Sequence, residues 1–270
     1  MSFSLTWLPD VLKAAGLKVA TEDGWENRGR GDVGKIVGVI CHHTAGPKNG
    51  NMPSLDTLKN GRKASPGQKA LPGPLAQLGL ARDGTFIVIA AGRAIHAGLG
   101  EFKGVKSGNS SFIGIEAENT GKPTDLPWPA VQLDAYQRGV AAILKHLEKD
   151  ETFCCGHKEY ARPNGRKVDP SLDMKEFRTA VGAILNGAAP PPNLIPVVEP
   201  NPPAGVAPRP TLRRGSKGDL VKTIQTKVGV NPDGQFGPRT EAAVREFQRD
   251  HDLVPDGIVG PQTWRALDAA

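Results

Sequence analysis

The chain has 270 residues, of which 38% are hydrophobic and 23% are charged, and its formal net charge at pH 7 is +6. This composition is typical of a soluble globular protein, and no stretch approaches the ~20 apolar residues of a membrane span. We therefore expect no membrane insertion, and the length predicts two domains.

The positive charge is unevenly placed along the chain. Residues 211–270 carry nine Lys or Arg against eight Asp or Glu, so most of the surplus lies in the first 186 residues. There it is spread out, without the basic runs and interleaved aromatic residues of a phosphate-binding surface. We expect no nucleic-acid partner. The sequence leaves two explanations of the excess positive charge open: attraction to another polyanion, or ordinary charge that keeps the protein soluble.

The N-terminus and the cysteines both favour a protein that is in the cytoplasm when its synthesis is complete. Residues 1–16 have no basic segment ahead of an apolar one, and Asp10 falls where the apolar part of a signal peptide would lie. Three cysteines, with Cys154 and Cys155 adjacent, do not form a disulfide framework. We expect no signal peptide, and cysteines that serve as small buried apolar residues.

Strands alternate with helices over the first 186 residues. The apolar patterns predict helices over 10–17, 54–62 (capped by Ser54), 128–149 and 172–187, and strands over 35–43, 85–90 and 110–119. The strand over 35–43 is apolar on both faces, as in a sheet covered by helices. The expected fold class is mixed α/β, with a central sheet flanked by helices.

Two strand positions are notable for function. His42 falls at the carboxyl end of its strand, where α/β folds place their sites. Period-two alternation puts Glu116 and Glu118 on one face of their strand, opposite Ile115 and Ala117.

The chain then changes character twice. Residues 187–210 are dense in proline, which predicts a semi-rigid linker between a domain over 1–186 and a second over 211–270. The second domain repeats a pattern after 23 residues: a Pro-Asp-Gly turn, then Gly-Pro-x-Thr leading into a helix. With the helical pattern before them, the two copies predict a small three-helix unit with Trp264 in its core.

Three residues in two distant segments have the side chains of a zinc site. These are His42, His157 and Asp169, with Lys167 two places before the last. Two imidazoles and one carboxylate can hold zinc and leave a fourth position open for water, as catalytic sites do. Taken singly, each residue has a simpler explanation. His42 could be a hydrogen-bonded core histidine and His157 a turn cap. Asp169 could belong to an Asp-Pro turn, and Lys167 to a solvated basic loop.

Four motifs follow one another over residues 37–171: ICHHTAG (40–46), AIHAG (94–98), FIGIEAEN (112–119) and GH with GRKVDP (156–170). In this order they resemble the zinc-dependent N-acetylmuramoyl-L-alanine amidases of the peptidoglycan-recognition type, a group that includes phage endolysins. The residues LRRGSKGDLVKTIQ (212–225) and both DGxxGPxT turns resemble a small three-helix peptidoglycan-binding domain.

The resemblance implies roles for single residues. It implies that His42, rather than its neighbour His43, binds Zn²⁺ together with His157 and Asp169. It further implies that Glu116 is the general base or the carboxylate that orients the attacking water.

The same resemblance suggests residues around the metal. Lys167 would be the cation that stabilises the transition state. Gln77 stands nearest the place where many relatives carry a histidine or tyrosine that faces the substrate. His96, in the AIHAG motif, would lie near the cleft as a second substrate contact, with a structural role as the alternative.

The function implied is hydrolysis of the amide bond between the lactyl group of N-acetylmuramic acid and L-alanine in bacterial peptidoglycan. Such an endolysin would be made in the host cytoplasm and released by a holin-type membrane partner. Without a heptad repeat or a long apolar stripe, we expect a monomer. A non-catalytic peptidoglycan-recognition protein and a bacterial autolysin of the same chemistry are the alternatives. A glycosidase is disfavoured, because Glu116 and Glu118 share one face of one strand.

Overall fold

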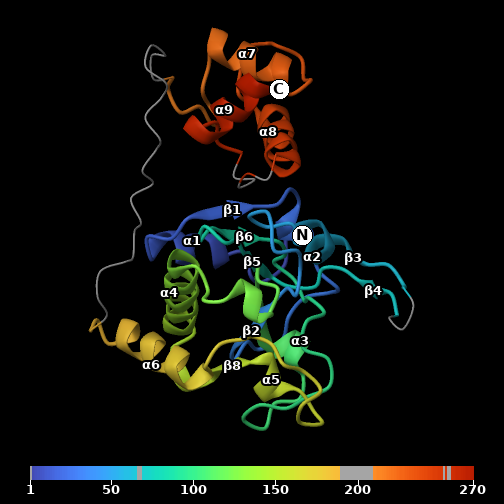
Figure 1. Ribbon diagram of the computed structural model, residues 1–270, viewed down its shortest axis with the longest axis vertical. Coiled ribbons are helices and arrows are strands. Elements are labelled where there is room, and N and C mark those ends of the chain that lie inside the picture. The colour runs from blue at the N-terminus through green and yellow to red at the C-terminus, as the bar shows by residue number, and fades with distance from the viewer. Residues whose placement is uncertain (1, 66–68, 189–208, 252, 254–256) are drawn as a thin grey trace. The chain divides into compact units, whose positions relative to one another are not determined.

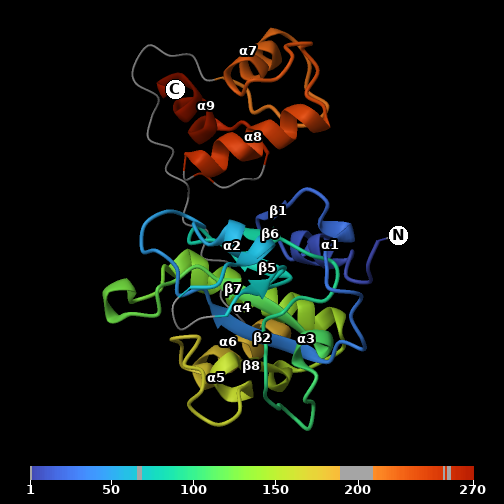
Figure 2. The same cartoon turned by 90° about the vertical axis from the view of Figure 1, so that its right-hand side faces the viewer.

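The computed structural model describes residues 2–65, 69–188, 209–251, 253 and 257–270. Its contacts divide the chain into two units, Met1–Asn193 and Leu194–Ala270, each of which is described by itself (Figures 1 and 2). The segment predicted as a proline-rich linker, 187–210, lies almost wholly outside the described residues.

A six-stranded sheet forms the centre of the first unit. Its strands lie in the order β1 (Val19–Thr21), β6 (Phe86–Val88), β5 (Leu78–Leu80), β7 (Phe112–Ala117), β2 (Gly38–His43) and β8 (Cys154–Gly156). Only β5 and β6 pair in antiparallel fashion; the other neighbouring pairs are parallel. A separate hairpin joins β3 (Gly61–Arg62) to β4 (Leu71–Pro72).

Helices cover both faces of this sheet (Figure 1). One face packs against α1 (Leu8–Ala14), α4 (Ala130–His146) and α6 (Met174–Leu185), and the other against α2 (Leu55–Asn60), α3 (Gly108–Ser111) and α5 (His157–Tyr160). Short 3₁₀ turns lie at Trp25–Asn27, Pro123–Asp125 and Glu151–Phe153. The predicted mixed α/β class, with helices around a central sheet, is thereby confirmed.

The central strand β2 is buried along its whole length, as its continuous apolar pattern predicted. Val39 and Cys41 face the core under α4, whereas Ile40 faces the cluster under α5. By the same alternation His42 shares the face of Ile40. All three cysteines are buried and unpaired, and Cys41 Sγ lies 3.5 Å from Cys154 Sγ.

Two local predictions need correction. The first helix begins at Leu8 rather than Asp10, because Pro9 fits a first helical turn without loss of a hydrogen bond. Ser54 does stand at the amino end of α2, but its side chain does not cap the helix. Its hydroxyl instead donates to Glu118 Oε1 at 3.0 Å.

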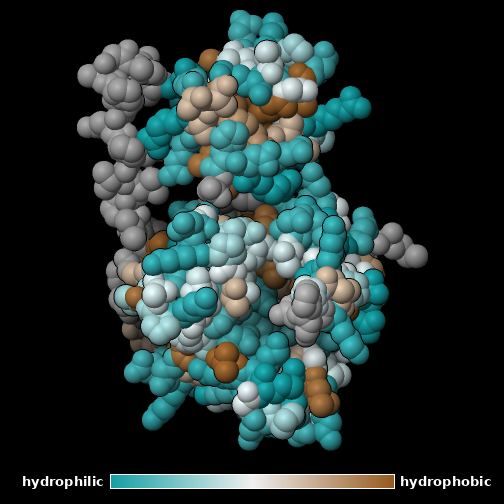
Figure 3. Space-filling model, turned by 45° about the vertical axis from the view of Figure 1, so that its right-hand side comes forward, coloured by the Kyte–Doolittle hydropathy of each residue, from teal (hydrophilic) through white to brown (hydrophobic). Residues whose placement is uncertain are grey.

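Within the described part of the chain, every helix is too short or too polar to span a lipid bilayer. The face shown in Figure 3 is mostly hydrophilic, with hydrophobic residues in separate spots. Four large hydrophobic side chains are exposed among the described residues, namely Leu99, Leu126, Val168 and Leu220. The apolar content of the chain is thus largely placed in its cores.

The second unit consists of α7 (Asp219–Lys227), α8 (Pro238–Asp250) and α9 (Pro261–Ala269). Proline stands in the first turn of α8 and of α9, as the repeated Gly-Pro-x-Thr pattern predicted. The core contains Val221, Ile224, Phe236, Val244, Trp264 and Leu267. The indole of Trp264 is only 4% exposed, which agrees with its predicted core position.

Two buried glutamines, also 23 residues apart, hold the repeated turns. Gln225 accepts from the backbone N–H of Gly234 at 2.8 Å, and its amide donates to Thr240 Oγ1 at 3.0 Å. Gln248 makes the equivalent contacts, accepting from the Gly257 N–H at 2.9 Å and donating to Thr263 Oγ1 at 3.1 Å. We call each set of contacts a Gln-to-turn clasp. In this small unit the two clasps fix the loops, a role that disulfides or metals often have in domains of this size.

We expect Gln225→Leu to destabilise the second unit by about 1–3 kcal/mol, because it leaves the buried N–H of Gly234 without an acceptor. Urea unfolding followed by NMR through the indole signal of Trp264 measures this unit separately. Gln262→Leu is the control, since Gln262 is exposed on α9 and its replacement should cost less than about 0.5 kcal/mol. Equal midpoints for the two variants would contradict the clasp.

Candidate metal centre

Strand register brings three predicted site residues to one edge of the sheet. β2 lies between β7 and β8, with His42 paired to Glu116 and Cys41 paired to Gly156. His157, the residue after Gly156, therefore lies beside His42. Because these strands are parallel, their carboxyl ends meet at the same edge.

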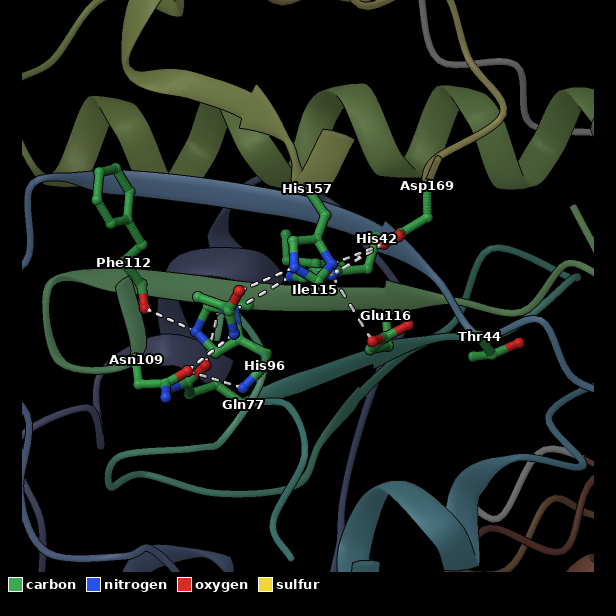
Figure 4. A network of polar contacts seen from close by, with 12 residues as sticks. His42, Thr44, Gln77, His96, Asn109, Phe112, Ile115, Glu116, His157 and Asp169 are labelled. Carbon is green, nitrogen blue, oxygen red and sulfur yellow. Dashed lines mark hydrogen bonds and ion pairs between the residues drawn. The ribbon is translucent and has the colours of Figure 1, made fainter. Parts of the chain in front are cut away.

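Asp169 completes the cluster from a loop that follows α5. The backbone N–H of Lys158 donates to the Asp169 carbonyl at 2.8 Å, which holds this loop against the start of α5. Asp169 Oδ2 lies 3.1 Å from His42 Nδ1 and 3.1 Å from His157 Nδ1. The two Nδ1 atoms are 3.0 Å apart, so the three atoms form a nearly equilateral triangle (Figure 4).

This triangle fits a tetrahedral zinc ion. Bonds of 2.0–2.1 Å to nitrogen and oxygen ligands place neighbouring ligand atoms about 3.3 Å apart. Two imidazoles and one carboxylate also supply only three ligands, which leaves the fourth direction for water or substrate. Among the described residues, these three form the one group whose ligand atoms converge in this way.

The charge states suit a cation. Burial lowers the pKa of His42 to about 4, so its ring is neutral at pH 7 and has a free electron pair. Burial alone would raise the pKa of Asp169, but its close contacts with the imidazoles of His157 and His42 outweigh burial and hold that pKa below its ordinary value. A neutral imidazole and an ionised carboxylate are the forms that bind metal.

Glu116 stands beside the triangle, where its Oε1 lies 3.8 Å from His42 Nδ1. Its other oxygen, Oε2, is buried and has no hydrogen-bond partner among the described residues. Burial, and then the nearby charge of Asp169, raise the pKa of Glu116 well above its ordinary value. A buried carboxylate oxygen without a donor is costly unless something else binds it.

The cluster opens into a cavity of about 650 Å³. Lys167 is half-buried in its wall, together with Glu116 and Asp169, and no ion pair to its amine is found among the described residues. Residues of α2 and of the segment before it, including Thr57 and Leu58, also line this cavity. A cation in the wall of an open cleft is suited to an anionic group of a bound molecule.

Gln77 does not contact this cavity, and the prediction that it meets substrate is corrected. Its side chain is fully buried. Its Oε1 accepts from the Gly114 N–H at 2.8 Å, and its amide donates to the Gly92 carbonyl at 3.3 Å. The polar ends of Gln77 are thus occupied by the backbone of the sheet and of the loop after β6.

The two remaining histidines of the motifs have different surroundings. His43 points away from the triangle, because neighbouring side chains of a strand alternate, and its Nδ1 accepts from the Ser171 N–H at 3.1 Å. His96 reaches the cleft wall but is only 8% exposed, and its Nδ1 lies 3.1 Å from His42 Nε2. Its ring therefore contacts a predicted ligand.

Sequence reasoning missed two groups that fix the site. The hydroxyl of Tyr136, from α4, accepts from the His42 N–H at 2.9 Å and lies 3.1 Å from the His42 carbonyl. Glu118 accepts from Thr44 Oγ1 at 2.7 Å and from the Ser54 N–H at 3.0 Å, which joins the end of β2 to the start of α2. For Glu118, the sequence offered one indication, namely that it shares a strand face with Glu116. For Tyr136 it offered none.

Two family models match the chain. Residues 32–172, just over half of it, match the family described as N-acetylmuramoyl-L-alanine amidase. Residues 217–267 match the family described as putative peptidoglycan binding domain.

Similar proteins cover smaller parts of the chain. A protein from the bpoA1 3′ region of Kitasatospora aureofaciens is 47% identical over 66 residues, 22% of this chain and 56% of that protein. The zinc D-Ala-D-Ala carboxypeptidase of Streptomyces albus G is 43% identical over 65 residues, 21% of this chain and 26% of that enzyme. The chain thus spans about half and about a quarter of these relatives.

Among solved structures, the N-acetylmuramyl-L-alanine amidase AmiD from E. coli is 19% identical, with a TM-score of 0.43. That match covers 93% of this chain and 95% of the AmiD chain.

Proposed function

Because the chain belongs to the N-acetylmuramoyl-L-alanine amidase family, we propose that it is a zinc-dependent hydrolase of peptidoglycan. The bond cleaved is the amide between the lactyl group of N-acetylmuramic acid and L-alanine. The observation that carries this proposal is the triangle of His42 Nδ1, His157 Nδ1 and Asp169 Oδ2 at the floor of an open cleft.

Zinc held by these three residues would polarise the scissile carbonyl and lower the pKa of water to about 7. The protein's own groups supply the remaining steps. Glu116, whose Oε2 has no partner among the described residues, accepts the proton of the attacking water and passes it to the leaving amine nitrogen. Burial and the charge of Asp169 raise the pKa of Glu116, which makes its carboxylate a stronger proton acceptor for this role.

Lys167 stabilises the negative charge that develops on the carbonyl oxygen. We expect Lys167→Met to lower kcat about 100-fold, which corresponds to the roughly 3 kcal/mol of one well-placed oxyanion donor. Zinc affinity should change little, because Lys167 is not a ligand. Kinetics on purified peptidoglycan test the role of Lys167. The control is Lys145→Met, because Lys145 is an exposed cation of α4. A variant with unchanged kcat would exclude the role.

End-group analysis of digested cell wall tests the reaction itself. The proposal requires new amino termini of L-alanine, which disappear with a chelator and return with zinc. New reducing sugar ends would instead indicate a glycosidase. Binding of wall without any new end group would favour the alternative of a non-catalytic recognition protein.

The second unit is proposed to hold the enzyme on its polymer, since residues 217–267 match a peptidoglycan-binding family. Deletion of residues 211–270 should weaken wall binding while the metal centre stays formed, because its ligands all come from the first unit.

The biological role proposed is that of a phage endolysin, with a bacterial autolysin of the same chemistry as the alternative. A catalytic and a wall-binding unit on one chain suit either role. Expression in a bacterial host separates them: an endolysin should lyse the cells only when a holin-type membrane protein is produced with it. Lysis without that partner would favour the autolysin.

A further inference from the structure

One dipeptide, His96-Ala97, contacts both ligand histidines on the side away from the metal triangle. His96 Nδ1 lies 3.1 Å from His42 Nε2. The carbonyl of Ala97 lies 2.9 Å from His157 Nε2. The rings of His96 and His42 meet edge to face, with an interplanar angle of 88°, and Figure 4 shows Asn109 beside His96.

These contacts determine which ring nitrogen carries the proton. A carbonyl oxygen only accepts, so His157 Nε2 must carry the hydrogen and Nδ1 is left free. On the other side, His96 Nε2 lies 3.3 Å from the Phe112 carbonyl and donates to it, so His96 Nδ1 is an acceptor. His42 Nε2 therefore also carries its hydrogen, and both Nδ1 electron pairs point into the triangle.

Asn109 fixes this dipeptide. Its Oδ1 accepts from the backbone N–H of His96 at 2.9 Å and from that of Ala97 at 2.8 Å. The ring of His96 also requires Gly114 below it, because a Cβ there would lie 2.5 Å from His96 Cγ. Gln77 holds the N–H of Gly114, which gives this buried glutamine a place in the same support.

We propose that His96-Ala97, held by Asn109, is the platform that positions both zinc-binding imidazoles. His96 and Asn109 are then positioning residues for the metal, and neither is a ligand. Both ring nitrogens of His96 are engaged within the protein. The proposal rests on the metal site of the proposed function, but not on which bond the enzyme cleaves.

Zinc affinity of purified full-length variants, measured by competition with a chromophoric chelator, tests the platform. Asn and Leu have nearly the same shape, and the amide oxygen of Asn falls where His96 Nδ1 accepts. We expect His96→Leu to weaken zinc binding about 10- to 100-fold, the usual effect of losing a group that orients a ligand, and His96→Asn to stay within about threefold of wild type.

Asn109 offers a second pair of variants that touches neither ligand. Asn109→Leu removes the acceptor for two backbone N–H groups and should weaken zinc about tenfold, whereas Asn109→Asp keeps the acceptor and should not weaken it. If His96→Leu fails to fold, this pair decides the question. Proton and nitrogen NMR of the zinc-bound protein should also show a slowly exchanging Nε2 hydrogen on His42 only where the platform is intact.

The outcomes separate this inference from the proposed function. If the wild-type chain binds no zinc, the metal site itself is wrong. If it binds zinc and all four variants bind it equally, the platform is wrong and the site survives. A raised KM with unchanged zinc affinity in the His96 variants would make His96 a substrate contact, and would overturn the inference.

Discussion

His42→Ala is expected to lose zinc and hydrolytic activity together. The ring supplies one corner of a triangle whose edges are 3.0–3.1 Å, and alanine leaves two ligands to hold the ion. Zinc sites with four ligands contribute about 10–16 kcal/mol, so the loss of one ligand should weaken binding by roughly 10²- to 10³-fold. Metal content by atomic emission and release of L-alanine amino termini are the two measurements.

A histidine elsewhere provides the control for this variant. His146 stacks on Trp7 at the end of α4, with ring centroids 4.0 Å apart, and is not part of the metal triangle. His146→Ala should keep both zinc and activity. Wild-type enzyme stripped by a chelator should recover with added zinc, whereas His42→Ala should not. Full activity of His42→Ala at trace zinc would remove His42 from the ligand set.

Glu116→Gln should separate the two properties that His42→Ala loses together: it should retain zinc but lose hydrolytic rate. The amide keeps the size of the side chain but cannot accept a proton, and we expect kcat to fall about 10²- to 10⁴-fold. The structural reason is the position of Glu116 beside His42 in the strand register, with one oxygen free of partners among the described residues. Zinc affinity should remain close to wild type, since Glu116 is outside the triangle.

The pH dependence gives this prediction a second measurement. A general base acts only when ionised, so kcat should rise as pH rises through the pKa of Glu116. Burial and the charge of Asp169 place that pKa well above the ordinary range of a carboxyl. Glu116→Gln should lose this limb of the profile, while Glu26→Gln, an exposed residue of the same unit, should keep it. An unchanged profile in Glu116→Gln would assign the base to another group.

Strong local patterns made much of the fold predictable. The apolar run before His42 indicated a strand buried on both faces, and β2 is buried throughout. The repeated Gly-Pro-x-Thr turns indicated two helix starts, at Pro238 and Pro261. By contrast β5 has only three residues, with Gly79 at its centre, and such a short segment gives no periodic signal.

The site was predictable as a set of residues but not as a set of contacts. Motif order indicated His42, His157 and Asp169, yet their convergence depends on strand pairing between residues more than 100 positions apart. Gln77 was misassigned because position along the chain does not reveal side-chain burial. Tyr136 and Asn109 carry no motif, since a hydroxyl or amide that meets a backbone group can come from any nearby element.

Chain order also determines when the metal centre can first exist. His42 is synthesised 127 residues before Asp169, an interval of roughly 6–25 s at 5–20 residues per second. A nascent chain that ends after α4 already contains β2 and β7, with His42 and Glu116, but lacks two of the three proposed ligands. The proposed metal centre therefore cannot form before the segment after β8 that carries Asp169 has been synthesised, although it needs no residue of the second unit.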